Sequence, residues 1–148
     1  MTQPATHFTP TNSSSPLGYD TSCTDSLRSG IFVSGIRLVA EACYRRLITP
    51  RGMLQGGEAE ADYGLDLLNL IGSVSTTNDA AALEGQISAE LQKDERVQSV
   101  SATVTVVTTQ PTVSLTISIS VQSAAGPFTM VLAVSQVTVA LLGITPGA

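Results

Sequence analysis

The C-terminal third of this chain carries no charged side chain. Every Asp, Glu, Lys, Arg and His lies at or before Arg96, so residues 97–148 contain none. Over the same residues apolar side chains alternate with serine and threonine, which is the period of a half-buried β-strand. Sheet edges are normally protected by charges, prolines or bulges, because an unpaired edge templates further strands. A charge-free sheet therefore needs its edges or outer face covered by other chains, unless a Ser/Thr face is simply solvated.

The alternation predicts three strand segments. The first has Val100, Ala102, Val104 and Val106 on one face, and Gln110-Pro111 separates it from a second strand over residues 113–121. The third run starts at Phe128 and changes phase near Ser135 and Gln136, which predicts a bulge or break there. The sequence does not identify the edge strand, so the candidate positions for strand sharing are Thr129 and Val131 on the third run and Thr103 on the first.

The residues before Arg96 have helical periodicity. Apolar side chains spaced by three and four predict an amphipathic helix over residues 34–48, with Ser34 as its N-cap and Thr49-Pro50 as its end. A Gly-rich, acidic stretch over residues 51–61 predicts an exposed loop. A short helix over residues 65–71 follows, and then a longer helix with Asn78 or Asp79 as its cap and Leu83, Ile87 and Leu91 on one side.

These patterns predict an α+β fold in which N-terminal helices pack on a C-terminal antiparallel meander of three or more strands. Residues 1–18 are rich in Pro, Thr and Ser, which predicts a flexible leader. We expect residues 19–148 to form a single domain, because the chain of 148 residues suits one modest core.

The composition argues against several classes of function. Two cysteines and one histidine, His7, cannot form a Cys/His zinc site, and we expect Cys23 and Cys43 to be packed free thiols. An aromatic content of 4% and a net charge of -5 argue against nucleic acid as a partner. The most apolar stretch, residues 128–144, is too short and too polar to span a membrane. We expect no cofactor.

Two groups of charged residues are candidates for a site. Arg45, Arg46 and Arg51 form a basic concentration at a helix end, where they either complement the helix dipole or offer an ion-pairing surface to an acidic partner. Asp94-Glu95-Arg96 lies at a helix-to-strand junction. The guanidinium of Arg96 can fork onto a carboxylate or onto carbonyls there, unless the junction is only a solvated helix end.

The acidic residues Glu58, Glu60 and Asp62 raise the question of an enzyme. Glycoside hydrolysis needs one carboxyl group held protonated in an apolar setting and a second one ionised across the bond. These three residues lie in a Gly-rich stretch of a chain that has no tryptophan to line a sugar groove. A solvated acidic loop is therefore favoured, and we expect no enzyme activity.

Three segments carry a resemblance to a known family. They are Arg45-Arg46-Leu47-Ile48-Thr49-Pro50-Arg51-Gly52, then Asp62-Tyr63-Gly64-Leu65-Asp66-Leu67, and Asp94-Glu95-Arg96-Val97 leading into alternating strands. In this order the chain resembles the contractile-tail baseplate wedge family, the sheath-initiator group that includes a phage baseplate protein named lysozyme-like and its type VI secretion counterpart. The resemblance covers residues 34–142.

The resemblance implies a structural wedge component, present in six copies around the tail hub of a virion and made in the host cytoplasm. One face would bind other wedge proteins, and the sheet would join the first ring of sheath or tube proteins by sharing strands. The lysozyme-like name suggests a peptidoglycan-cleaving tail enzyme as an alternative, and an assembly adaptor in a sheathless tail is another.

The resemblance also implies site residues. An interaction loop and basic patch would contain Arg45, Arg46, Arg51, Gly52, Tyr63 and Gly64. The family's Glu-Pro-Arg motif, which clamps onto the helical core bundle of the wedge, corresponds to Asp94, Glu95 and Arg96 in this chain. The acid and the guanidinium are retained, but the rigid turn that proline would impose is absent.

Overall fold

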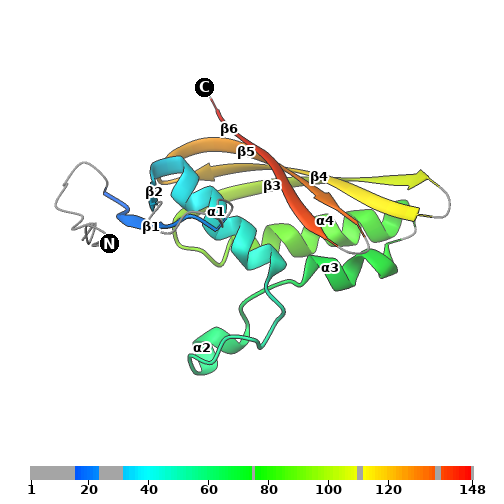
Figure 1. Ribbon diagram of the computed structural model, residues 1–148, viewed down its shortest axis with the longest axis horizontal. Helices are drawn as coiled ribbons and strands as arrows, with labels where there is room; N and C mark the ends of the chain where they lie inside the picture. Colours follow the sequence, from blue (N-terminus) through cyan, green and yellow to red (C-terminus); the bar gives the residue numbers. More distant parts are fainter. Residues whose placement is uncertain (1–15, 24–31, 75, 110–111, 136–137, 148) are drawn as a thin grey trace, which may run out of the picture.

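A computed structural model describes residues 16–23, 32–74, 76–109, 112–135 and 138–147 (Figure 1). The predicted α+β fold is confirmed, with helices preceding an antiparallel meander. Most of the predicted flexible leader, residues 1–15, lies outside the described residues. The elements in chain order are β1 (Tyr19–Thr21), β2 (Phe32–Ser34), α1 (Gly35–Ile48), α2 (Glu58–Ala61), α3 (Leu67–Leu70), the 3-10 turn η1 (Ile71–Ser73), α4 (Thr77–Leu91), β3 (Val97–Thr109), β4 (Thr112–Ser123), β5 (Gly126–Val134) and β6 (Val139–Pro146).

The main sheet has the strand order β3-β4-β5-β6, and each neighbouring pair is antiparallel. The predicted third run is in fact two strands, because the phase change marks a chain reversal that pairs Val134 with Val139. As a result β5 is an interior strand, and the proposed edge positions Thr129 and Val131 do not lie on an edge. Thr103 lies on β3, which is an outer strand of the sheet.

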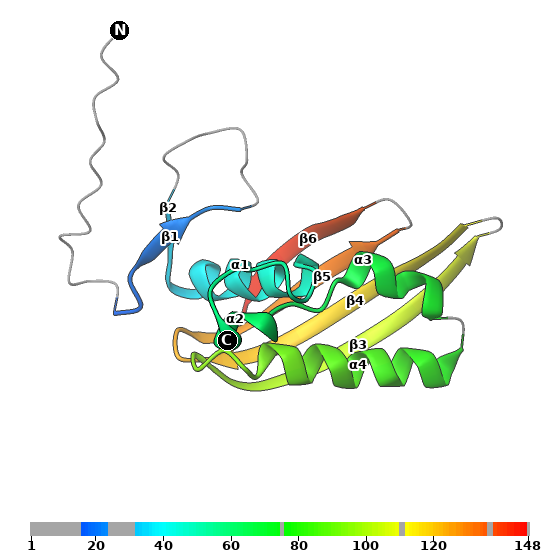
Figure 2. The ribbon, with the colours of Figure 1, turned by 90° about the horizontal axis from the view of Figure 1, so that it is seen from below.

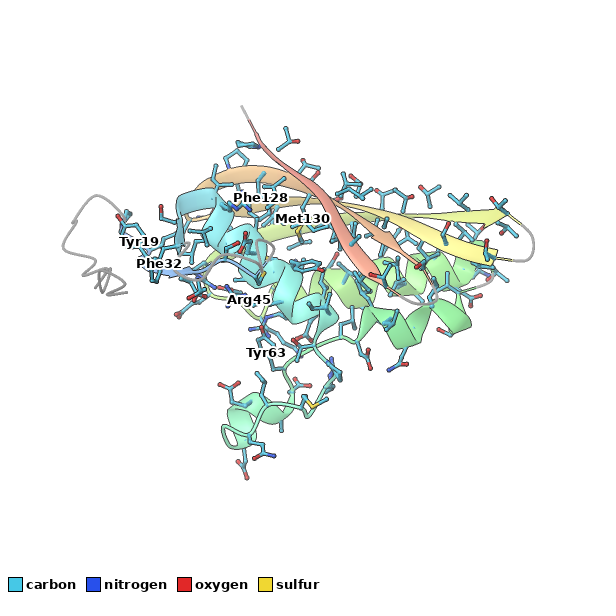
Figure 3. The ribbon with its side chains drawn as sticks, in the orientation of Figure 1. Tyr19, Phe32, Arg45, Tyr63, Phe128 and Met130 are labelled. Carbon is cyan, nitrogen blue, oxygen red and sulfur yellow. The ribbon has the colours of Figure 1, made fainter. Side chains whose placement is uncertain are left out.

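Helices α1 and α4 cover one face of this sheet (Figure 2). The alternation on the strands separates the two faces, so that the apolar side chains meet the helices and the serines and threonines face away. Figure 3 places Phe128 and Met130 on the buried side of β5. The largest fully buried apolar side chains are those of Phe128, Leu47, Leu67, Ile87, Leu91, Leu115, Ile117, Ile119, Met130 and Leu132.

Helix α1 begins and ends close to its predicted bounds. Ser34 is the N-cap residue, although its side chain makes no capping hydrogen bond to the described backbone. Helix α4 begins earlier than predicted, because its cap is Thr76 and not Asn78 or Asp79. Asp79 instead occupies the third helical position, where its carboxylate accepts from the Thr76 N–H at 2.8 Å while its own N–H donates to the Thr76 hydroxyl at 3.2 Å.

Other local predictions are corrected in detail. The loop over residues 51–61 is exposed as expected but contains the short helix α2, and the helix expected over residues 65–71 is split into α3 and η1. Cys23 and Cys43 are free thiols, as predicted, and burial raises the pKa of Cys43 to about 12. No helix among the described residues is long and apolar enough to cross a membrane.

Candidate interaction site

All charged residues lie at or before Arg96, in the part of the molecule that we call the charged half. Within it, the buried carboxylate of Glu90 on α4 binds donors from several segments of the chain. Its side chain is 1% exposed and accepts four hydrogen bonds. The donors are Arg46 Nη1 at 3.2 Å, Arg51 Nη2 at 3.1 Å, Lys93 Nζ at 2.8 Å and the backbone N–H of Gly64 at 2.9 Å. Glu90 thus joins the end of α1, the segment after it, and α4.

The sequence position of Glu90 indicates that its side chain is buried, although a count of apolar residues on α4 does not include it. Glu90 follows Ile87 by three residues and Leu83 by seven, so it shares the buried side of α4. A charge in such a position must be paired, since an unpaired buried charge is strongly unfavourable. Burial raises the pKa of Glu90, but the hydrogen bonds from Lys93, Gly64 and Arg46 outweigh it and hold the pKa below its usual range.

Gly64 allows two chain segments to approach closely. Its φ is +105°, and a Cβ atom there would lie 2.2 Å from the carbonyl oxygen of Thr49. The Gly64 carbonyl accepts from Arg51 Nε at 3.1 Å, and the backbone N–H of Asp66 donates to the Thr49 carbonyl at 3.2 Å. The Thr-Pro-Arg-Gly and Asp-Tyr-Gly segments, which are separate in the sequence, therefore lie in direct contact in the structure.

Tyr63 completes this junction. The guanidinium of Arg46 lies 4.2 Å from the centre of its ring, which is a cation-π contact. Figure 3 shows Tyr63 where the chain leaves the helical layer below α1. Arg46 is therefore held between an aromatic ring and the Glu90 carboxylate.

Residues 51–62, which we call the arm, project from this junction. In Figure 1 helix α2 lies away from the sheet and from the other helices. The arm begins with a tight turn in which the Met53 N–H donates to the Pro50 carbonyl at 3.2 Å. Gly52 has a φ of +80° in the third position of that turn, where a type II turn requires glycine.

Arg45 does not belong to the same cluster. Its Nη2 lies 2.8 Å from Asp20 Oδ2 and 3.3 Å from the carbonyl of Thr21, both in β1. Figure 3 shows Arg45 and Tyr63 as separately labelled side chains near α1. The structure therefore brings Arg46 and Arg51 together but directs Arg45 to β1, and all three arginines have carboxylate partners within the chain.

Arg96 forks onto the carboxylate of Asp94. Its Nε lies 2.9 Å from Oδ1 and its Nη2 lies 2.6 Å from Oδ2, while its backbone N–H donates to Oδ1 at 3.0 Å. Burial raises the pKa of Asp94, but the hydrogen bonds from Arg96 outweigh it and lower the pKa below its usual range. Glu95 is exposed between them. The acid and the guanidinium thus order the junction in a chain that lacks the proline.

The acidic residues of the arm do not have the setting of a paired acid catalyst. Asp62 lies 2.8 Å from Lys93 Nζ, and this hydrogen bond lowers the pKa of Asp62. A general acid requires the opposite shift. Glu58 is exposed to solvent, and no group of three or more His, Cys, Asp and Glu among the described residues could hold a metal ion.

Glu90 and the residues that donate to it, Arg46, Arg51, Gly64 and Lys93, form what we call the Glu90 cluster. A groove of about 540 Å³ lies beside this cluster. Arg51, Asp62 and Lys93 form its charged lining, and Leu65, Leu70 and Ala89 contribute apolar surface. The groove is therefore bordered by two of the cations that hold Glu90, Arg51 and Lys93.

The two outer strands of the sheet are protected differently. On β3 the Val104 N–H donates to Glu84 Oε1 of α4 at 2.8 Å, so a charged residue from the helical layer does guard this edge. The expectation of a sheet without charged guards was therefore wrong for β3. On β6 the carbonyl of Val139, the first residue of the strand, accepts from the Tyr44 hydroxyl at 3.0 Å.

Comparisons of the chain with protein-family models, with curated proteins and with solved structures found no match.

Proposed function

We propose that this chain is a structural component of a contractile-tail baseplate wedge, which links the wedge core to the first sheath ring. The observation that carries the proposal is that β6, whose own sequence is uncharged, is an outer strand of the main sheet. The hydroxyl of Tyr44 bonds to the backbone of β6 at Val139, the first residue of the strand. Residues 140–146 therefore present backbone donors and acceptors to which another chain can add a strand.

The asymmetry of the sheet supports β6 over β3 as the accepting edge. Helix α4 lies under β3 and supplies Glu84 to it, whereas β6 carries a bulge at Leu142, whose side chain is 62% exposed. A bulge protects an edge against indiscriminate pairing but leaves the strand on either side available. Strand sharing at β6 agrees with the way the resembled family joins its sheath.

The charged half would then face the wedge. It contains Arg46 and Arg51, which are held by Glu90, and the Asp94–Arg96 pair, and the resemblance assigns Arg46, Arg51, Asp94 and Arg96 to wedge contacts. Six copies around the hub, a location in the tail baseplate, and wedge, sheath and tube proteins as partners are parts of this proposal.

Purified particles from the cells that make this protein test the proposal. We expect mass spectrometry to find the chain in the particle, and cryo-electron microscopy to show a strand of a neighbouring protein beside β6. Leu142→Lys should reduce incorporation, while Thr103→Lys on β3 serves as the matched control and should not. Particles without the chain, or clearing of a peptidoglycan suspension by the purified protein, would contradict the proposal.

A further inference from the structure

The arm exposes apolar side chains that the fold does not use. Residues 51–58 are all exposed, Met53 to 63% and Leu54 to 39%. Both side chains lie beyond the turn at Gly52, on the segment that projects away from the sheet and the helices (Figure 1). Adjacent exposed apolar residues on a projecting segment are typical of a surface that binds another protein.

The base of the arm is held firmly. Arg51 at its start and Lys93 beside its end both bind the buried carboxylate of Glu90, and Lys93 also binds Asp62 at 2.8 Å. The close contact of Gly64 with Thr49 fixes the point at which the chain returns to the body. A segment anchored at both ends loses less conformational entropy when it binds than a free loop does.

The arm itself is folded by glycines. Gly57 has a φ of +103°, and its carbonyl accepts from the Glu60 N–H at 3.1 Å. A Cβ atom at Gly56 would lie 2.2 Å from the Glu60 side chain, so this side chain packs over Gly56. The arm therefore presents Met53 and Leu54 next to a short acidic helix.

The charge of the arm indicates the chemistry of its partner. The cation in the arm, Arg51, is directed back to Glu90 and to the Gly64 carbonyl. The acidic side chains of the arm are Glu58, Glu60 and Asp62, of which Glu58 and Asp62 are exposed. An acidic border around two apolar side chains fits an apolar recess that is bordered by lysine or arginine.

We propose that the arm docks into such a basic-rimmed apolar recess on a different protein. This inference names the partner chemistry for the face that the proposed function assigns to the wedge, and it rests on that function. Met53 and Leu54 would enter the recess, and the carboxylates of Glu58 and Glu60 would pair with its rim. The Glu90 cluster would act only by positioning the arm.

Photocrosslinking of the full chain tests this inference. A photoreactive amino acid replaces Met53 in the cells that normally make the protein, and in a parallel strain it replaces Leu68 of α3, which is 37% exposed and serves as the control. We expect one main adduct from position 53, about tenfold more abundant than from position 68. Peptide mapping should place the crosslink beside apolar residues flanked by lysine or arginine.

Charge reversal sharpens the result. Glu58→Lys combined with Glu60→Lys should lower the adduct yield from position 53 by about tenfold, because like charges then meet at the rim. Glu95→Lys, at an exposed position outside the arm, should leave the yield unchanged. The neutral pair Glu58→Gln and Glu60→Gln should give an intermediate yield, and added salt should lower the wild-type yield.

The outcomes separate this inference from the proposed function. An adduct with a basic-rimmed protein that is absent from the particle would support the docking arm and contradict the wedge assignment. The docking inference is overturned by an adduct with a second copy of this chain, by equal yields from positions 53 and 68, or by a yield that charge reversal does not change. Detection of the chain in particles is measured separately and reports on the proposed function alone.

Discussion

The two layers of this molecule are stabilised by different interactions. The layer of helices and loops contains the described charged residues and buries two carboxylates, Glu41 and Glu90, each with several donors. The sheet contains no charge and contributes apolar side chains to the common core. Ion pairs depend on pH and salt, whereas apolar burial depends on neither to first order. Changes of pH or salt should therefore alter the contribution of the ion pairs to stability and leave the contribution of apolar burial largely unchanged.

Glu41, in the middle of α1, is a second buried carboxylate with several donors. Its carboxylate accepts from the Ser22 hydroxyl at 3.0 Å, the Cys23 N–H at 2.9 Å and Arg37 Nε at 2.9 Å. These bonds hold the segment after β1 against α1. Both buried carboxylates thus attach a peripheral segment to a helix, a task that the sheet accomplishes by strand pairing.

The largest expected effect is in the sheet. Phe128 is 2% exposed on β5, and Phe128→Ala should lower the free energy of unfolding by about 4 kcal/mol, because it leaves a cavity in the core. Urea unfolding at pH 7 and at pH 4 should give the same loss. Val107→Ala, at a position 41% exposed, is the control and should change little. A strong pH dependence of the Phe128 effect would contradict the separation of the layers.

Glu90→Ala should be the largest effect in the charged layer. It removes the acceptor for Arg46, Arg51 and the Gly64 N–H, and we expect a loss of about 3 kcal/mol in the free energy of unfolding at pH 7. Exposed Glu95→Ala is the matched control and should stay within about 0.5 kcal/mol. Equal losses for the two variants would show that the cluster is not structural.

The pH dependence should identify the carboxylate. The pKa of Glu90 is lowered in the folded chain from an ordinary value of 4.5, so its contribution is present above that value and is lost as the pH falls through the folded pKa. Glu90→Gln should therefore lose less stability than the wild type between pH 7 and pH 3. The pKa of Asp94 is also lowered, so the stability of both the wild type and Glu90→Gln should still fall somewhat as the pH falls. Parallel curves would contradict the prediction.

A smaller effect is expected at the β3 edge, where the two layers touch. Glu84→Ala removes the acceptor of the Val104 N–H and should cost about 1 kcal/mol, while Glu84→Gln keeps an acceptor and should cost less. Amide exchange should show faster exchange at Val104 in the alanine variant. Unchanged exchange at Val104 would mean that Glu84 does not guard the edge.

The smallest change in stability is expected at the β6 edge. Leu142→Lys alters an exposed bulge and should shift the free energy of unfolding by less than about 0.5 kcal/mol. A charge on an unprotected edge opposes pairing with further strands, so the variant should stay soluble at higher concentration. Light scattering measures this difference, and Thr129→Lys on the interior strand β5 provides the comparison. Equal solubility of Leu142→Lys and the wild type would indicate that β6 is not the exposed edge.

Much of the fold could be predicted from local patterns. The alternation after Arg96, the helical spacing before Pro50 and the phase change near Ser135 are properties of neighbouring residues, and each predicted its element. The phase change was correctly located, and of the two predicted causes, a bulge or a break, the structure has the break: β5 ends at Val134 and β6 begins at Val139.

The candidate site could be predicted less completely from the sequence than the fold. Arg46, Arg51, Tyr63 and Gly64 were selected individually, but the residue that joins them, Glu90, was missed because only apolar residues were counted on its helix. A carboxylate in an apolar phase is a usable signal. Three of its partners, Gly64, Arg51 and Arg46, are however 26, 39 and 44 positions away in the sequence, and no local pattern relates them to it.

The amino-acid pattern alone therefore determined where the long helices α1 and α4 and the alternating strands of the main sheet lie, and which face of these strands is buried, since these depend on periods of two and of about 3.6 residues. Tertiary structure alone decided that Thr129 is interior, that Glu84 guards β3 and that β6 is the other outer strand. Edges and buried charge pairs are set by which elements come to lie side by side. That arrangement minimises the free energy of the whole chain, so it cannot be read from any one segment.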